Sequence, residues 1–296
     1  MYDQIRVIGI PMDLGQALRG VDMGPSAVRY AGLAPRLRQR GYTVEDAGNV
    51  VVPVRDFIQH QAATAYLPAI LQVCEAVYDA ARCAMADGVL PVFIGGDHSI
   101  SIGTVGGVSH GARTGVLWVD AHGDINTHVS SRSGNVHGMP LAALMGHGSA
   151  ELVDLGRPGP KVREEDVVLV GIRDLDPPEK AFLNESDVTV YTMRAIDEQT
   201  MVRVAHEALD RLAGVDHLHV SLDLDSLDPR IAPGVGTPVP GGLSYREAHL
   251  LMEILADSGR VASVDVVEVN PILDVHNQTA EIAVQLVASL LGKSIL

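Results

Sequence analysis

Cysteine and aromatic residues are scarce in this chain. Its 296 residues include two cysteines, one tryptophan, seven tyrosines and three phenylalanines. Cys74 and Cys83 fall in one predicted helical segment, where a separation of nine positions puts them on roughly opposite faces. They cannot form a local disulfide, so a disulfide-stabilised secreted scaffold is not expected, and two reduced thiols favour a cytoplasmic location.

Long apolar runs and basic residues are also lacking. No run of about 18 apolar residues occurs, which predicts no transmembrane helix, and the opening MYDQIRVIGIPMD lacks the basic and apolar regions of a signal peptide. The 22 Lys and Arg are outnumbered by 37 Asp and Glu, giving a net charge of −15. So acidic a chain is not expected to bind nucleic acid or an anionic membrane surface.

What the sequence does contain is an alternation of short β-type runs and helical patterns. Strands are predicted at 5–10, 43–45, 90–94, 115–119, 167–172, 188–191, 218–222 and 261–267. Helices are predicted at 25–40, 65–87, 99–110, 178–185, 199–213, 244–257 and 278–291. Pro25 suits the first turn of a helix, and Ser244 with Glu247 forms a capping-box pattern. The alternation predicts a parallel α/β fold and leaves a doubly wound sheet and a (β/α)₈ barrel both open.

Polar residues gather where four of these strands end. GGDHS (95–99) follows the third strand, DAHGD (120–124) follows the fourth, SLDLDSLDP (221–229) closes the seventh, and EVNP (268–271) closes the eighth. In parallel α/β proteins the carboxyl ends of the strands form the edge at which ligands bind, in either architecture. The sequence therefore predicts a functional site at this edge.

Two of these clusters place acidic residues at alternate positions. In an extended chain such positions project to the same side, so Asp120, His122 and Asp124 are expected to converge, as are Asp223 and Asp225. Gathered without partners, these carboxylates would repel one another strongly. Divalent cations would resolve the repulsion.

The charges of the cluster match two such cations. The four aspartates balance two 2+ ions, while His98 and His122 supply one nitrogen each; Asp97 is an alternative contributor beside His98. A site dominated by oxygen donors suits Mn²⁺ better than structural Zn²⁺, which favours Cys and His. Two metals about 3.5–4 Å apart can share a water and lower its pKa, so that hydroxide forms near neutral pH.

At this point the chain resembles the ureohydrolase family, and most closely the bacterial arginases within it. The segments that carry the resemblance are GGDHSI (95–100), DAHGDIN (120–126), SGNVHGMP (133–140), SLDLDSLDP (221–229), APGVGTPVPGGLSYRE (232–247) and EVNPILD (268–274). They span essentially the whole chain, which implies one domain over residues 1–296. The resemblance also implies a three-layer α/β/α architecture with a central, mostly parallel eight-stranded sheet, not a barrel.

The resemblance implies a binuclear manganese enzyme. Its reaction is hydrolysis of L-arginine to L-ornithine and urea, by attack of a metal-bridging hydroxide on the guanidinium carbon. Two Mn²⁺ ions per subunit are implied. The first takes His98, Asp120, Asp124 and Asp225, and the second takes Asp120, His122, Asp223 and Asp225.

Three catalytic roles follow from the same resemblance. Asp124 accepts the hydroxide's hydrogen bond and aims it. Glu268 binds the planar guanidinium, for which a carboxylate has matching bidentate geometry. His137 carries a proton to the departing amine, and an imidazole pKa near 6.5 suits that task.

The resemblance further assigns the residues that recognise the substrate. Asn126, Ser133 and Asn135 hold the α-carboxylate, Asp176 faces the α-ammonium with Glu179 assisting through water, and Thr237 lines the guanidinium end. Pro178 departs from the family pattern, in which a small residue such as Gly is often found, and could shift the loop that carries Asp176.

The sequence leaves alternatives to an arginase open. The chain could be another amidinohydrolase, acting on agmatine or a guanidino acid, or an inactive scaffold or metal-binding regulator, or a zinc deacetylase, whose fold is related. The resemblance also implies a homo-oligomer, a trimer or a hexamer, in which Asp197, Arg246 and Glu253 could make contacts between subunits.

Overall fold

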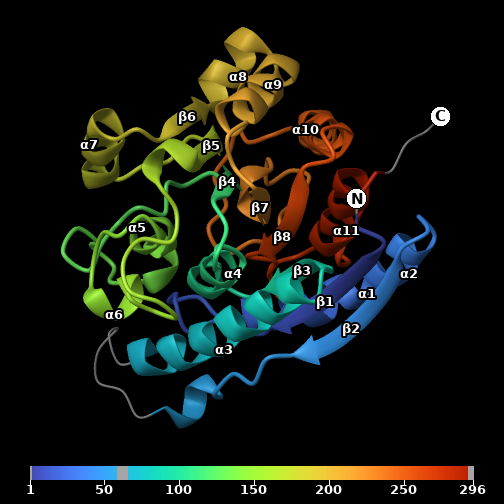
Figure 1. Ribbon diagram of the computed structural model, residues 1–296. Coiled ribbons are helices and arrows are strands. Elements are labelled where there is room, and N and C mark those ends of the chain that lie inside the picture. The colour runs from blue at the N-terminus through green and yellow to red at the C-terminus, as the bar shows by residue number, and fades with distance from the viewer. Residues whose placement is uncertain (1, 59–65, 293–296) are drawn as a thin grey trace.

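A parallel eight-stranded sheet organises the chain in a computed structural model that describes residues 2–58 and 66–292 (Figure 1). The strands are β1 (Gln4–Ile10), β2 (Thr43–Asn49), β3 (Leu90–Gly95), β4 (Thr114–Val119), β5 (Val167–Ile172), β6 (Thr189–Thr192), β7 (His217–Asp223) and β8 (Val261–Val267). Their order across the sheet is β2-β1-β3-β8-β7-β4-β5-β6, and neighbouring strands pair in parallel throughout this described part. The sheet is therefore wholly parallel rather than mostly parallel.

Helices cover both faces of the sheet (Figure 1). One face packs against α3 (Leu67–Ala86), α4 (Ser101–Val108) and α5 (Pro140–Leu144). The opposite face packs against α1 (Gly24–Tyr30), α2 (Leu33–Arg38), α9 (Met201–Arg211), α10 (Tyr245–Asp257) and α11 (Gln278–Leu290). The remaining helices are α6 (Ala150–Val153), α7 (Pro177–Glu185) and α8 (Met193–Gln199). The three-layer architecture is confirmed, and a barrel is excluded because the sheet is open at β2 and β6.

The central strands are buried because both of their faces are covered. Every residue of β3, β4, β5 and β8 is buried, which accounts for their nearly continuous Val, Ile and Leu runs. The edge strand β2 instead has one buried residue, Val44. The strand runs to Asn49, whereas the sequence predicts one over 43–45 only. The prediction is too short because the exposed residues of β2 lack the apolar pattern of a buried strand.

The predicted helices differ from the observed ones in two respects. The helix expected at 25–40 is divided into α1 and α2 at Gly32, whose φ of 87° lies in the left-handed region. The short helices α5, α6 and α8 were not predicted, because segments of four to seven residues show too little periodicity. The capping box of Ser244 and Glu247 at the start of α10 is confirmed.

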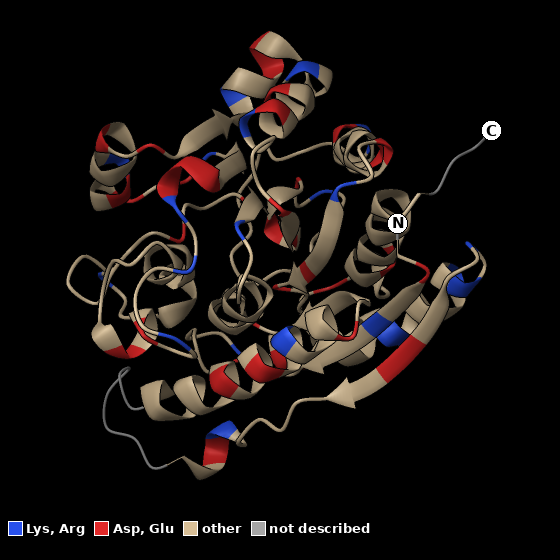
Figure 2. Ribbon diagram, viewed as in Figure 1, with Lys and Arg blue, Asp and Glu red and all other residues tan. Residues whose placement is uncertain are grey.

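Acidic residues are distributed over many elements rather than confined to one of them (Figure 2). This agrees with the excess of 37 Asp and Glu over 22 Lys and Arg. Among the residues that the structure describes, no helix combines the length and apolar character needed to cross a bilayer.

The strand order brings the four polar segments together. β3, β8, β7 and β4 are consecutive neighbours at the centre of the sheet, although they lie far apart in the sequence. Since all four strands run in the same direction, the segments that follow them emerge at one edge. The topology thus places GGDHS, EVNP, SLDLDSLDP and DAHGD side by side.

Candidate metal centre

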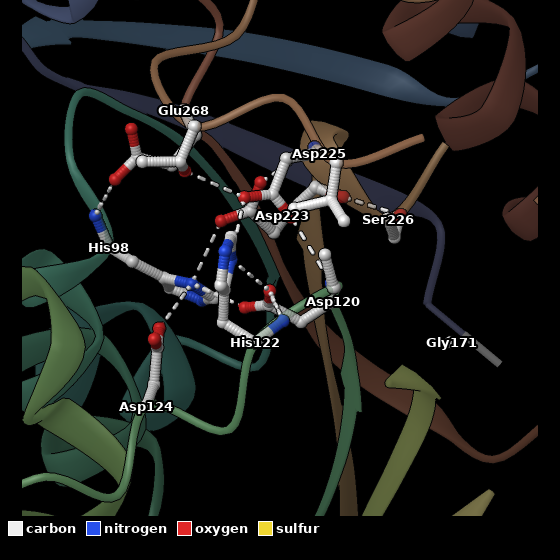
Figure 3. A network of polar contacts seen from close by, with 12 residues as sticks. His98, Asp120, His122, Asp124, Gly171, Asp223, Asp225, Ser226 and Glu268 are labelled. Atoms are coloured by element: carbon white, nitrogen blue, oxygen red, sulfur yellow. Dashed lines mark hydrogen bonds and ion pairs between the residues drawn. The ribbon is translucent and has the colours of Figure 1, made fainter. Parts of the chain in front are cut away.

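Two groups of acidic and imidazole side chains meet at this edge (Figure 3). One consists of His98, Asp120 and Asp223, all of them buried, and the other consists of Asp120, His122 and Asp225. Within each group the potential ligand atoms lie within 4.8 Å of one another. Asp120 belongs to both, so the two groups form one continuous cluster.

Tight turns, rather than extended strands, bring these side chains together. The Asp120 Oδ1 accepts a hydrogen bond of 2.7 Å from the His122 N–H, and the Asp223 Oδ1 accepts one of 2.8 Å from the Asp225 N–H. β7 ends at Asp223 and continues as a 3-10 turn over Leu224–Ser226. The predicted convergence is therefore present, but its expected cause was wrong: an Asp side chain that bonds to the backbone two residues on bends the chain at each site.

The two carboxylate oxygens of Asp120 face different groups. The Asp120 Oδ2 is 3.1 Å from His98 Nδ1, and the Asp120 Oδ1 is 3.5 Å from His122 Nδ1. The His122 Nδ1 is also 3.0 Å from the Asp225 Oδ2. Asp120 therefore offers one oxygen to each group, as a ligand shared by two cations would.

The buried ring nitrogen of His98 tests whether a cation fits. His98 Nδ1 is 3.1, 3.0 and 3.2 Å from carboxylate oxygens of Asp120, Asp124 and Asp223, yet it has no hydrogen-bond partner. A buried polar atom without a partner is costly, and four carboxylates so close together repel one another. A divalent cation bound between the nitrogen and these oxygens would satisfy both demands, so the donor set fits two divalent cations.

The pKa values of the clustered side chains also favour the binding of cations. Burial raises the pKa of Asp124 to about 6, with the Asp120 charge adding to the effect. Burial and neighbouring carboxylates likewise raise the pKa of Asp223 and of Asp225. Burial opposes the protonation of His98, but the surrounding carboxylates raise its pKa well above the usual value. Cations that bind there would displace the protons that these raised pKa values favour.

The structure divides the ligands between the two groups differently from the expected assignment. Asp223, not Asp225, lies beside His98, while Asp225 lies beside His122. Asp97, the alternative to His98, points elsewhere: its carboxylate accepts hydrogen bonds from the N–H groups of Gly15 (2.8 Å) and Ser99 (3.1 Å). The cluster contains the six residues expected as ligands, and Asp97 is a structural residue beside it.

His137 and Glu268 form a pair next to the cluster. The His137 Nδ1 is 3.0 Å from the Glu268 Oε1, which also accepts a hydrogen bond of 3.0 Å from the His98 N–H. The other oxygen, Oε2, accepts a hydrogen bond of 2.8 Å from the Gln16 side chain. Burial opposes the protonation of His137, but Glu268 raises its pKa to about 9. His137 is consequently protonated at neutral pH.

A cavity of about 170 Å³ opens in front of the cluster. It is lined by His122, Asp124, Asn126, Ser131, Ser133, Asn135, His137, Gly138, Asp174, Asp176, Glu179, Asp223, Asp225 and Thr237. All of the expected substrate-binding residues except Glu268 line it. Glu268 is fully buried and in contact with His137.

Hydrogen bonds already order several of the lining residues. The Asn126 Nδ2 donates to the Asp176 Oδ2 at 3.1 Å. This bond joins the residue expected to hold the substrate's α-carboxylate to the residue expected to face its α-ammonium. The Ser133 Oγ accepts a bond of 3.2 Å from the Asn135 N–H. The Thr237 Oγ1 donates to the Asp225 Oδ2 at 3.0 Å, so Thr237 touches a potential metal ligand as well as the cavity.

Glu179 is buried and holds two loops together. As the third residue of α7 it completes a capping box with Asp176, whose N–H donates to the Glu179 Oε2 at 2.8 Å. The Oε1 accepts a bond of 3.2 Å from the Ile125 N–H, in the loop after β4. Burial raises the pKa of Glu179 to about 7. Pro178 lies in the first turn of α7, where proline is tolerated, and Asp176 remains at the cavity.

Sequence reasoning missed several residues that support the cluster. The Ser221 Oγ is 2.8 Å from the His98 Nε2, and Trp118 contacts both His98 and Asp120. The Arg173 guanidinium donates to backbone carbonyls of both the 225–227 turn and Val239. The only available signal was their proximity to the motifs in the sequence, which does not reveal what a side chain contacts.

Comparison with known proteins shows similarity over the full chain. A model of the arginase family matches residues 3–292. The chain is 52% identical over 297 residues to the arginase of Bacillus subtilis (strain 168), with 100% of each chain covered. Among solved structures, the arginase of Bacillus caldovelox matches with a TM-score of 0.96 and 48% identity, covering 99% of this chain and 100% of that one. A crystal structure of the arginase from Bacillus subtilis matches with a TM-score of 0.94 and 50% identity, over the same shares.

Proposed function

The chain belongs to the arginase family, and from that membership we propose that it hydrolyses L-arginine to L-ornithine and urea at a site for two Mn²⁺ ions. The observation that carries the proposal is the pair of groups that share Asp120 at the base of a cavity. Similarity to arginases over the whole chain, at 52% and 48% sequence identity, supports the same reaction.

The composition of the cluster supports manganese. Four carboxylates and two imidazoles gather there, which suits Mn²⁺ better than a cation that prefers thiolates. His98, Asp120, Asp124 and Asp223 would hold one ion, and Asp120, His122, Asp223 and Asp225 the other. When bound, the two cations supply a hydroxide nucleophile near neutral pH, because they lower the pKa of water.

Asp124 and His137 are placed to handle the protons of the reaction. Both line the cavity, so both can reach a substrate held there. Asp124 accepts a hydrogen bond from the attacking water and fixes its direction. His137, protonated through its contact with Glu268, donates its proton to the amine that leaves as the tetrahedral intermediate collapses.

The acidic and polar residues that line the cavity suit the guanidinium and the α-amino acid group of arginine. We assign the guanidinium to Thr237, which lines the cavity, and to Glu268, which lies behind the lining in contact with His137. Asn126, Ser133 and Asn135 would hold the α-carboxylate, and Asp176 with Glu179 would attract the α-ammonium. Agmatine lacks the α-carboxylate. The three residues proposed to hold that group, Asn126, Ser133 and Asn135, would therefore favour arginine over agmatine.

We extend the proposal to a cytoplasmic homo-oligomer, a trimer or a hexamer. The two cysteines are free, which suits a reducing compartment. Ile272, Leu273 and Val275 are exposed by 64%, 48% and 52% in one loop and would gain from burial between subunits. Sedimentation equilibrium tests the assembly: a mass of three or six chains supports it, and a stable monomer contradicts it.

Urea release from a panel of guanidino compounds tests the reaction. The protein is loaded with Mn²⁺ and supplied in parallel with L-arginine, agmatine and 4-guanidinobutyrate. We expect arginine to be hydrolysed with the highest kcat/KM. Faster turnover of agmatine or guanidinobutyrate would identify another amidinohydrolase, and no urea from any compound would favour an inactive scaffold.

A further inference from the structure

The one tryptophan of the chain lies behind the metal centre. Trp118 is the fifth residue of β4 and is 0% exposed. In the sheet it pairs with Leu169 of β5 and with Ser221 of β7. Its side chain is therefore enclosed on the face of the sheet that packs against α4 and α5.

The Trp118 ring supports the imidazole of His98. The two rings are stacked, with centroids 3.9 Å apart and an angle of 8° between their planes. The Ser221 Oγ holds one edge of the imidazole through the Nε2 at 2.8 Å. A ring fixed by its face and by one edge has a single orientation, and in this orientation the Nδ1 points at the carboxylates.

The indole N–H fixes a second ligand. The Trp118 Nε1 donates to the Asp120 Oδ2 at 3.0 Å. That oxygen is the one 3.1 Å from His98 Nδ1, whereas the Oδ1 accepts the His122 N–H. Each carboxylate oxygen thus has one donor, so the plane of the carboxylate is set before any cation arrives. A buried indole N–H needs a hydrogen-bond partner, and here the partner is a candidate metal ligand.

We propose that Trp118 is a positioning residue that holds His98 and Asp120 in the arrangement that binds the cation beside His98. The inference rests on the proposed function only in that the cluster binds divalent cations; it does not depend on arginine as the substrate. Groups that orient the ligands of a metal typically change its affinity by 10–100-fold when they are removed. Trp118 acts on two ligands at once, through stacking and through its N–H.

The Trp118→Phe variant separates the two contacts. Phenylalanine retains an aromatic face for His98 but lacks the donor to Asp120. We expect Mn²⁺, measured by equilibrium dialysis, to bind one of its two sites about 10–100-fold more weakly. At saturating Mn²⁺ we expect the content of bound ion to reach that of the parent protein, because the metal ligands themselves are retained.

Phe93→Leu is the matched control. Phe93 is an equally buried aromatic residue on β3, which β8 and β7 separate from β4, and it packs in a different apolar core. Loss of its ring should lower the thermal unfolding temperature without weakening Mn²⁺ binding. If Trp118→Phe binds both ions as tightly as the parent, or if Phe93→Leu weakens binding equally, Trp118 has only a packing role and the proposal is overturned.

Intrinsic fluorescence keeps the proposal testable even if the variant does not fold. Since Trp118 is the chain's one tryptophan, the emission of the unaltered protein excited at the indole band reports on this position. Paramagnetic Mn²⁺ added to the metal-stripped protein should quench it in step with the ion that binds beside His98. Emission unchanged at full Mn²⁺ occupancy would overturn the proposal. A protein that shows quenching but releases no urea would contradict the proposed reaction alone.

Discussion

His137 Nδ1 lies 3.0 Å from the Glu268 Oε1, so the expected proton carrier and the expected guanidinium-binding residue are in direct contact. His137 lines the cavity and Glu268 does not. Under the proposed function, a guanidinium that enters the cavity would meet His137 before Glu268 and would compete with it for the same carboxylate. The proposed function therefore predicts that substrate binding and the protonation of His137 are coupled through Glu268.

Replacing Glu268 should lower the pKa of His137. In the Glu268→Gln variant the carboxylate that stabilises the imidazolium is gone, while the burial that opposes protonation remains. We expect the His137 pKa to fall from about 9 to about 6.5 or lower. A pH titration of the histidine NMR signals in the parent and the variant checks this. A His137 pKa that stays near 9 would show that Glu268 is not the cause.

The same contact should make the effect of Glu268→Gln on stability depend on pH. A raised histidine pKa means that the folded state binds the proton more tightly than the unfolded state. The contribution is fully present below about pH 6.5 and is lost as the pH rises through about 9. The stability difference between parent and variant, from urea unfolding, should therefore shrink between these pH values. A difference that grows over this range would contradict the coupling.

Asp124→Asn should remove most of the turnover while arginine still binds. Asparagine keeps the size of the side chain but loses the charge that accepts and aims the attacking water's hydrogen bond. We expect kcat to fall on the order of 10²–10⁴-fold with little change in KM, measured with Mn²⁺ saturating and its content determined. Asp210→Asn, at an exposed position of α9, is the control. Strong residual activity at full metal content would count against the aiming role.

Asn135→Ala should impair arginine far more than agmatine. The side chain is expected to hold the α-carboxylate, and a hydrogen bond to a charged group contributes about 1.5–3 kcal/mol, or roughly 10–100-fold in kcat/KM. Agmatine has no carboxylate and should be nearly unaffected. Asn184→Ala, at an exposed position of α7, controls for a general effect. Equal losses on both substrates would show that Asn135 does not read the carboxylate.

Glu179→Ala should raise the KM for arginine without loss of metal. The side chain joins Asp176 to Ile125, so its removal frees the loop that carries Asp176, the residue proposed to attract the substrate's ammonium. Loss of such a cap costs about 0.5–2 kcal/mol of stability, visible in urea unfolding. Glu185→Ala, at the exposed end of α7, is the matched control. Unchanged KM in the presence of lowered stability would restrict Glu179 to a role in folding.

Much of the fold could be predicted because both faces of the central strands are covered. Continuous apolar runs such as Val167–Ile172 and Val261–Val267 identify buried parallel strands without any knowledge of their partners. The order of the strands could not be derived this way, because nothing local encodes that β8 inserts between β3 and β7. The family resemblance supplied the architecture that periodicity left open.

The candidate site was predictable in its residue types but not in its contacts. The spacing of Asp120 and His122 signals a cluster, because carboxylates at strand ends need a counter-ion. The pairing of Asp223 with His98 depends on the turn at Leu224–Ser226, which the sequence does not reveal. The role of Glu179 was also hidden, since a glutamate at a helix start is usually exposed, whereas this one is buried between two loops.

A titration of Mn²⁺ into the metal-stripped protein tests the central claim most directly. Bound Mn²⁺ and the rate of urea release from L-arginine are measured in the same samples. We expect binding to saturate at two ions per chain and the rate to rise as the second ion binds. Full turnover without bound divalent cation, or saturation with no urea released, would contradict a binuclear site that hydrolyses arginine.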